Sequence, residues 1–128
     1  MLLETLFAAG VGAALYGGIE ILWRGRTHWT MLLAGGLCFA IMYLIATRTD
    51  WPALEKWLAS AAVITAVEFV TGALVNVRMG WNVWDYSSMP LNLYGQICPL
   101  YSFYWFLLSI PGTALCGGIS RLVFRHAQ

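Results

Sequence analysis

Residues 57–77 read WLASAAVITAVEFVTGALVNV, and this stretch decides the fold class. A helix that spans a bilayer needs about 20 mostly apolar residues, and this stretch has that length. Its one charged residue, Glu68, stands near its middle. Three other stretches have a similar length and composition, at residues 2–23, 29–47 and about 97–124. The sequence therefore predicts an all-α, polytopic membrane protein, a bundle of four transmembrane helices in a single transmembrane domain over residues 1–128.

The composition of the chain supports this class. Of the 128 residues, 60% are hydrophobic and 10% are charged, whereas a soluble domain carries about 25% charged residues. The net charge of +1 gives no field for a polyanion, which excludes nucleic acid as a partner. Six of the seven tryptophans stand at or between the predicted helix ends, where amphipathic rings meet lipid headgroups: Trp23, Trp29, Trp51, Trp57, Trp81 and Trp84.

No sequence pattern points to a catalytic or metal centre. The chain has no nucleophile–His–acid set, no zinc-protease helix and no glycine-rich phosphate loop. Its three cysteines, Cys38, Cys98 and Cys116, lie in apolar stretches without metal-ligand spacing, and we interpret them as small buried apolar residues. We therefore expect no catalytic residue, no metal and no cofactor.

The longest connection, residues 78–96, reads RMGWNVWDYSSMPLNLYGQ. Its four aromatic residues argue against disorder, and a connection of this length in a compact protein is commonly functional. We expect an ordered interfacial or partly re-entrant segment before the last helix. Pro90 is placed to open a short helix there, because proline is well tolerated in a first helical turn.

The basic residues divide between the two ends of a four-helix bundle. The end that holds both termini carries Arg48, Lys56, Arg121 and Arg125, and the other end carries Arg24, Arg26 and Arg78. The small excess on the first side favours cytoplasmic termini, and we expect a multi-pass protein of the cell (inner) membrane. We interpret the remaining charges near the ends as rim charges without a functional role: Glu4, Asp50, Glu55 and Lys56.

Small and polar residues share faces of three predicted helices. The first helix has Gly10, Ala14 and Gly18 at a spacing of four, a pattern that brings helices together in lipid. One side of the third helix carries Thr65, Glu68, Gly72 and Asn76, and one side of the fourth carries Ser102, Ser109, Thr113, Cys116 and Ser120. The second helix is almost wholly apolar, and we expect it to face lipid.

Glu68 is the most informative residue, because a charged group at mid-membrane costs on the order of 3 kcal/mol. Three interpretations are open. It is a site that couples a proton or a cation, it pairs with a basic residue such as Arg24 or Arg78, or it is a protonated carboxyl that holds helices together. The last interpretation expects partners among Thr65, Asn76 and Ser109.

The other polar candidates have structural alternatives of equal or greater weight. Glu20 stands one turn before Arg24, so an ion pair within the helix is favoured over a functional role. Asp85 can cap the following turn through its side chain, pair with Arg78, or line the mouth of a pathway. Asn92 and Gln96 can contact a substrate or satisfy loose backbone groups before the last helix.

A motif follows Glu68: a Thr-Gly pair, then Trp-Asp-Tyr-Ser, Pro-x-Asn and Gly-x-Ile-Cys. Its positions here are Glu68, Thr71, Gly72, Trp84, Asp85, Tyr86, Ser87, Pro90, Asn92, Gly95, Ile97 and Cys98. This motif resembles that of small bacterial membrane proteins classed as ABC-transporter permeases of the CmpB type, and animal transmembrane protein 229 is similar. The resemblance implies a permease. Because this chain has no nucleotide-binding motif, an ATPase would be a separate subunit.

Three functions follow from these features. The first is a small transport protein, a permease or channel-like subunit, whose candidate substrate or ion contacts are Glu68, Glu20, Asp85, Asn92, Gln96 and Tyr86. Four short helices enclose little volume, so we expect a homo-oligomer, a dimer first, in the lipid bilayer. The second is an accessory subunit of a larger complex. The third is a lipid-acting enzyme in which Glu20, Glu68 and Asp85 supply acid and base.

Overall fold

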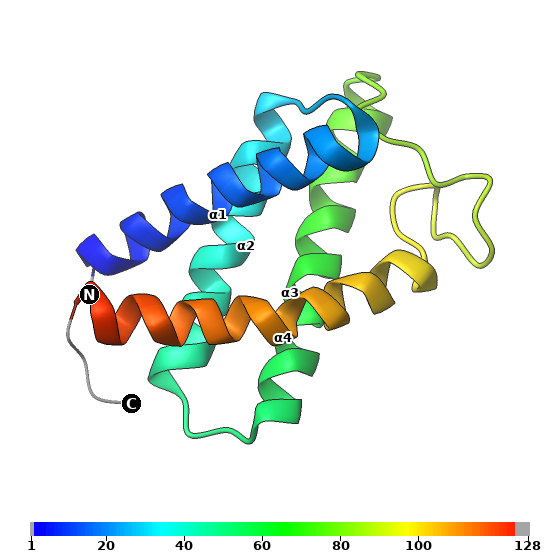
Figure 1. Ribbon diagram of the computed structural model, residues 1–128. Helices are drawn as coiled ribbons and strands as arrows, with labels where there is room; N and C mark the ends of the chain where they lie inside the picture. Colours follow the sequence, from blue (N-terminus) through cyan, green and yellow to red (C-terminus); the bar gives the residue numbers. More distant parts are fainter. Residues whose placement is uncertain (1, 125–128) are drawn as a thin grey trace.

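The computed structural model describes residues 2–124 and contains four long helices (Figure 1). They are α1 (Leu2–Arg24), α2 (Trp29–Arg48), α3 (Ala53–Gly72), which continues as the π-helix η1 (Ala73–Arg78), and α4 (Pro99–Leu122). All four are long and apolar enough to cross a membrane. No strand occurs in these residues, and the predicted all-helical membrane fold is confirmed.

Two helices begin at other residues than predicted. The third helix begins at Ala53 rather than at residue 57, directly after Pro52. Its first turn includes Glu55, whose charge suits a helix N-terminus but lowers the hydropathy of that turn. The fourth helix begins at Pro99, where a missing N–H costs nothing, and it continues through Pro111.

The second helix is buried, so the expectation that it faces lipid is wrong. Half of the most apolar 18-residue stretch of α2 is buried, a larger share than in the corresponding stretch of any of the other three helices. A Cβ on Gly36 would lie 2.9 Å from the carbonyl oxygen of Ala9, and a Cβ on Gly12 would collide with Phe39. These glycines let the backbones of α1 and α2 approach closely, and such close approach favours packing between helices in lipid.

The helices pack as two hairpins that meet through α2. Helix α1 packs against α2, α3 packs against α4, and α2 contacts both α3 and α4. Figure 1 shows that α1 and α4 cross α2 and α3 steeply. Contacts between α1 and α4 are sparse, and we call this boundary the α1–α4 seam. Three aromatic pairs bridge it, with ring centroids 5.6, 6.0 and 6.3 Å apart: Phe7–Phe124, Tyr16–Trp105 and Trp23–Tyr104.

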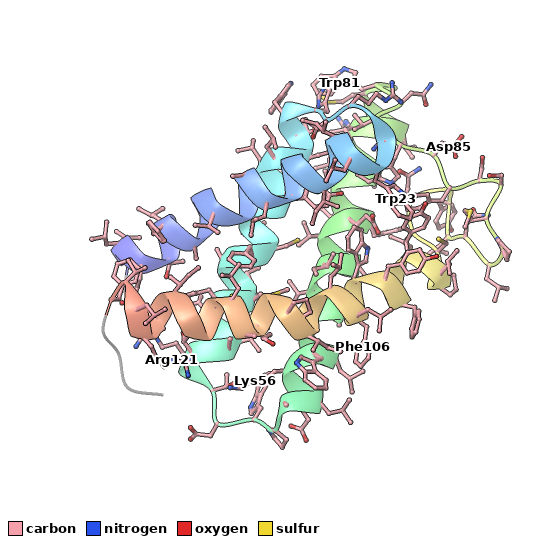
Figure 2. All side chains as sticks on the ribbon, viewed as in Figure 1. Trp23, Lys56, Trp81, Asp85, Phe106 and Arg121 are labelled. Carbon is pink, nitrogen blue, oxygen red and sulfur yellow. The ribbon has the colours of Figure 1, made fainter. Side chains whose placement is uncertain are left out.

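The two ends of the bundle carry different residues (Figure 2). Trp23, Trp81 and Asp85 lie at the end where residues 79–98 connect η1 to α4, and Lys56 and Arg121 lie at the opposite end. Both ends thus carry aromatic or charged side chains, as expected where headgroups meet water. Arg125, which entered the predicted orientation, lies outside the described residues.

Residues 79–98 form an ordered connection made of tight turns. Pro90 lies in a turn in which the N–H of Asn92 donates to the carbonyl of Met89 at 3.3 Å, so the predicted short helix at Pro90 is wrong. The reason is Leu91, which has a φ of +56° and so leaves the right-handed helical region. A second tight turn, through Tyr94 and Gly95, pairs Leu93 with Ile97.

Candidate functional site

Side chains of α3 and η1 hold the connecting segment, residues 79–98, against the bundle. The carboxamide oxygen of Asn76 accepts the backbone N–H of Val83 at 2.7 Å, and its nitrogen donates to the side-chain oxygen of Gln96 at 2.8 Å. The indole of Trp84 donates to the carbonyl of Gln96 at 2.9 Å. A Cβ on Gly72 would collide with Gln96, so glycine at this position lets the segment reach α3.

Polar side chains of the segment mostly bind its own backbone. A carboxylate oxygen of Asp85 accepts the N–H of Ser87 at 2.8 Å. The side chain of Asn92 accepts the N–H of Gly95 at 2.9 Å and donates to the carbonyls of Ser87 and Met89. These are the turn-forming contacts that the sequence offered as one alternative for Asp85 and Asn92. They fix the shape of the segment, which in turn places Tyr86.

Tyr86 reaches back from the segment to Glu68 in α3. Its hydroxyl donates to one carboxylate oxygen of Glu68 at 3.0 Å, and the indole N–H of Trp105 in α4 donates to the other at 3.3 Å. Only 6% of Glu68 is exposed. Three elements far apart in sequence therefore converge on one buried carboxylate.

Three carboxylates are buried in the described part of the chain, and each accepts a hydrogen bond from a tyrosine hydroxyl at 3.0 Å. Glu4 also pairs with Arg48 at 2.8 Å, and Glu20 pairs with Arg24 at 3.3 Å. No ion pair joins Glu68 to a basic side chain within residues 2–124. Glu68 thus differs from Glu4 and Glu20 in having neutral donors instead of a cation.

The partners proposed for Glu68 from sequence are engaged elsewhere. The hydroxyl of Thr65 lies 2.9 Å from that of Ser102, and the Ser109 hydroxyl donates to the carbonyl of Trp105 at 2.7 Å. Asn76 holds the segment, Arg24 pairs with Glu20, and Arg78 is exposed at the end of η1. Both polar faces nevertheless turn inward, because Ser109, Cys116 and Ser120 of α4 are buried.

A cavity of about 250 Å³ lies at the centre of the bundle, and Glu68 forms part of its wall. All four helices contribute, together with Trp84 of the segment, and the wall is almost entirely carbon. Four leucine and isoleucine residues of this wall are 40–46% exposed: Leu15, Ile19, Leu108 and Leu115. Since they come from α1 and α4, the cavity opens sideways at the α1–α4 seam.

A second, more polar cavity of about 840 Å³ adjoins the first at the segment end of the bundle. Tyr16, Trp84 and Trp105 line both cavities. The second cavity adds four charged side chains, Glu20, Arg24, Arg26 and Asp85. The guanidinium of Arg24 also donates to the carbonyl of Val83, which ties the end of α1 to the connecting segment.

The two titratable side chains of the segment are shifted in opposite directions. Hydrogen bonds from Ser87 hold the pKa of Asp85 below its ordinary value, so Asp85 is ionised at neutral pH. Burial, and next the nearby negative charge of Glu68, raise the pKa of the Tyr86 hydroxyl. Tyr86 therefore remains a donor toward Glu68 at every pH at which a membrane protein is ordinarily studied.

The structure brings together some of the predicted site residues and separates others. Glu68 and Tyr86 form a hydrogen bond, and Gln96 of the segment is 5% exposed and contacts Asn76. The three acids of the enzyme hypothesis occupy different surroundings: Asp85 is exposed, Glu20 is paired with Arg24, and Glu68 faces the inner cavity. Within residues 2–124, no group of three His, Cys, Asp or Glu side chains is arranged to hold a metal ion.

Two residues at carboxylate sites were not identified from the sequence. Trp105 lies among the small polar residues on one face of α4. The one sequence feature that pointed to a buried acceptor is its indole N–H, which needs a hydrogen-bond partner when it is buried. Glu4 was interpreted as a rim charge, and this is wrong: it is 5% exposed and contacts Tyr43 and Arg48. Its partners stand 39 and 44 residues later, beyond the reach of any helical spacing.

Comparison with known proteins gives one family. Residues 19–124 match the family described as "Putative ABC-transporter type IV", of the CmpB type. This range contains the connecting segment and the side chains that contact Glu68. No curated protein and no solved structure matches. The match covers most of the chain, and the protein therefore belongs to the CmpB-type ABC-transporter family.

Proposed function

We propose that this protein is a membrane transport protein in which Glu68 binds the transported or coupled cation, in the simplest case a proton. The observation that carries the proposal is the contrast among the three buried carboxylates. Glu4 and Glu20 have arginine partners, whereas the partners of Glu68 within residues 2–124 are two neutral donors, with a cavity beside them. The family and the four apolar helices agree with a transport-type protein.

The energetics favour an exchangeable cation at Glu68. A carboxylate without a counter-charge at mid-membrane is costly, on the order of 3 kcal/mol by insertion scales, and a proton or another cation removes that cost. Tyr86 and Trp105 hold the carboxyl group in position from two sides. A group that is fixed in place but lacks a permanent partner is suited to bind and release an ion.

The proposal is tested by proton uptake into vesicles. Purified protein is reconstituted into liposomes that contain a pH-sensitive dye, and a potassium gradient with valinomycin makes the interior negative. We expect wild-type vesicles to acidify faster than protein-free vesicles, and Glu68→Gln to reduce the rate to that of protein-free vesicles. Glu55→Gln, which removes an exposed carboxylate in the first turn of the same helix, is the matched control and should keep the wild-type rate.

A second candidate is a structural role, because the two hydrogen bonds of Glu68 join α3, the connecting segment and α4. In that case Glu68→Gln or Glu68→Leu should impair folding, seen as loss of a single symmetric peak in size-exclusion chromatography. A monodisperse Glu68→Gln protein with wild-type proton uptake would remove Glu68 from the transport mechanism.

The assembly of the transporter is also part of this proposal. Gly10, Ala14 and Gly18 are exposed on α1, and a Cβ on either glycine would meet nothing within 4 Å. We place the contact between two copies on this face, because small residues allow close approach of helices in lipid. The family's name implies an ATPase, and in this proposal the ATPase is a separate subunit.

A further inference from the structure

The two cavities together have the shape of a site for an amphipathic molecule. The inner cavity is lined almost entirely by carbon and has Glu68 in its wall, and the adjoining outer cavity has charged and aromatic side chains in its lining. Since Tyr16, Trp84 and Trp105 line both, a ligand can occupy the inner cavity while it remains in contact with the outer one. Their rings are the shared wall between the two spaces.

The charges around these spaces favour a cation. In the outer cavity, Arg24 and Arg26 are balanced by Glu20 and Asp85, and Arg24 is already engaged by Glu20 and by the carbonyl of Val83. Among the described residues that line the inner cavity, Glu68 is the one with a charged side chain. The combined site therefore carries one uncompensated negative charge, and that charge lies at its apolar inner end.

The aromatic rings add a second preference for a cation. Tyr16 and Trp105 have ring centroids 6.0 Å apart, and Tyr86 stacks on Tyr101 with centroids 4.8 Å apart. Rings of this kind attract weakly hydrated ammonium groups through their electron-rich faces, most strongly where water is excluded. An organic ammonium group loses less hydration on entering such a site than a metal ion does.

The route of entry is consistent with an apolar body. The inner cavity opens toward the bilayer at the α1–α4 seam, between Leu15 and Ile19 on one side and Leu108 and Leu115 on the other. Only sparse contacts and the aromatic pairs close this seam. A molecule dissolved in the hydrocarbon region can reach Glu68 from the side without crossing a polar barrier.

We propose that the cavities bind an amphipathic organic cation, which enters from the bilayer through the α1–α4 seam and places its ammonium group against Glu68. This inference rests on the proposed function and names its substrate class, since the same carboxylate then takes either a proton or the organic cation. An amphiphile with an anionic head is the competing occupant, because Arg26 is exposed beside the outer cavity.

Equilibrium binding with three matched probes tests the proposal. Radiolabelled benzyltrimethylammonium is bound to the protein in nanodiscs, and competition is measured with benzyl alcohol and with phenylmethanesulfonate. The three compounds share an aromatic body and differ in the charge of the head. We expect saturable binding of the cation and competition by neither analogue, and loss of at least tenfold in affinity in Glu68→Gln.

Two further variants locate the site. Ala34→Leu fills the inner cavity while it keeps Glu68, and it should also abolish binding of the cation. Glu55→Gln should leave binding unchanged, because Glu55 is exposed at the far end of α3. Size-exclusion chromatography of each variant confirms that it is folded, so that loss of binding is assigned to the site.

Each outcome separates this inference from the proposed function. Absence of saturable cation binding, with proton uptake that still depends on Glu68, would overturn the substrate class and leave the proposed function intact. Competition by phenylmethanesulfonate that is lost in Arg26→Gln would replace the cation with an anionic amphiphile. Cation binding that survives in Glu68→Gln would overturn the site itself.

Discussion

Tyrosine hydroxyls donate to all three buried carboxylates, and the difference among the sites lies in the second partner. Arginine completes the sites of Glu4 and Glu20, and tryptophan completes that of Glu68. Arg24 is half-buried, whereas Arg48 is exposed, so loss of the carboxylate leaves a partly buried unpaired cation at the Glu20 site. The Glu68 site has no such dependent cation in the described residues.

This contrast predicts different effects on stability from the same substitution. Glu20→Gln leaves the guanidinium of Arg24 without its ion pair, so we expect the free energy of unfolding to fall by on the order of 1–3 kcal/mol. Glu68→Gln should cost less, because its amide can accept from Trp105 and donate to the Tyr86 hydroxyl. Thermal unfolding in detergent measures both, with Glu55→Gln as the exposed control. A larger loss for Glu68→Gln than for Glu20→Gln would contradict this account.

Tyr86 is a positioning residue whose removal should alter a pH profile. Tyr86→Phe removes a donor that stabilises the ionised form of Glu68, so we expect the pH of half-maximal proton uptake to rise. The raised pKa of Tyr86 means that its hydroxyl stays protonated throughout the assay, and the change therefore reports on Glu68. Tyr94→Phe, on an exposed ring of the same segment, is the control. An unchanged midpoint with a lower maximal rate would assign Tyr86 a purely structural role.

At the scale of elements, the connecting segment and α3 depend on one another through Gly72. The Thr-Gly pair and the later residues of the motif look unrelated in sequence. In the structure, Gly72 provides the space in which Gln96 and Trp84 pack, and Asn76 provides the hydrogen bonds that hold the segment. The motif therefore describes one contact surface between a helix and a loop, and this surface places Tyr86 against Glu68.

Gly72→Ala should disturb this surface and, through it, the Glu68 site. The added Cβ would lie 2.9 Å from the Trp84 ring and would collide with the Gln96 side chain, so we expect a loss of about 1–3 kcal/mol in stability. We also expect faster amide exchange in residues 83–97. Gly118→Ala in α4, where a Cβ meets nothing within 4 Å, should stay within about 0.5 kcal/mol of wild type. Hydrogen-exchange mass spectrometry measures the exchange. Equal exchange rates of residues 83–97 in Gly72→Ala and Gly118→Ala would refute this role of Gly72.

Sequence reasoning succeeded where structure is local. Helix number and the inward faces of α3 and α4 follow from hydropathy and from a period of 3.6 residues, and both are confirmed. The burial of α2 and of Glu4 was missed, since both depend on which helices become neighbours. The same is true of Trp105, whose contact with Glu68 joins residues 37 positions apart.

At the scale of the whole molecule, the exposed glycine face of α1 lies next to the α1–α4 seam. Among residues 2–124, the exposed face of Gly10, Ala14 and Gly18 has no neighbour within 4 Å of a Cβ built on either glycine, whereas Leu15 and Ile19 line the inner cavity. Because Leu15 and Gly18 are three residues apart, they are neighbours on the surface of α1, and association through the glycine face places the second copy next to the side opening of the cavity.

The proposed dimer gives a prediction at this scale. We expect native mass spectrometry of the gently extracted protein to show a dimer, and Gly18→Leu to shift it to monomer because close helix approach is blocked. Ala114→Leu, a substitution of similar size at an exposed position of α4, should leave the dimer unchanged. A wild-type monomer, or a dimer that tolerates Gly18→Leu, would exclude this face as the interface.

The positions of the ion pairs also have a consequence for how the protein is made. Ribosomes deliver the N-terminal part of a chain first, and both Glu4–Arg48 and Glu20–Arg24 lie within the first two helices. Once residue 48 has been synthesised, both buried carboxylates of this helix pair have their arginine partners. The two donors to Glu68 are both present only after Trp105 has been synthesised. When α3 is inserted ahead of α4, Glu68 therefore enters the membrane without its two donors.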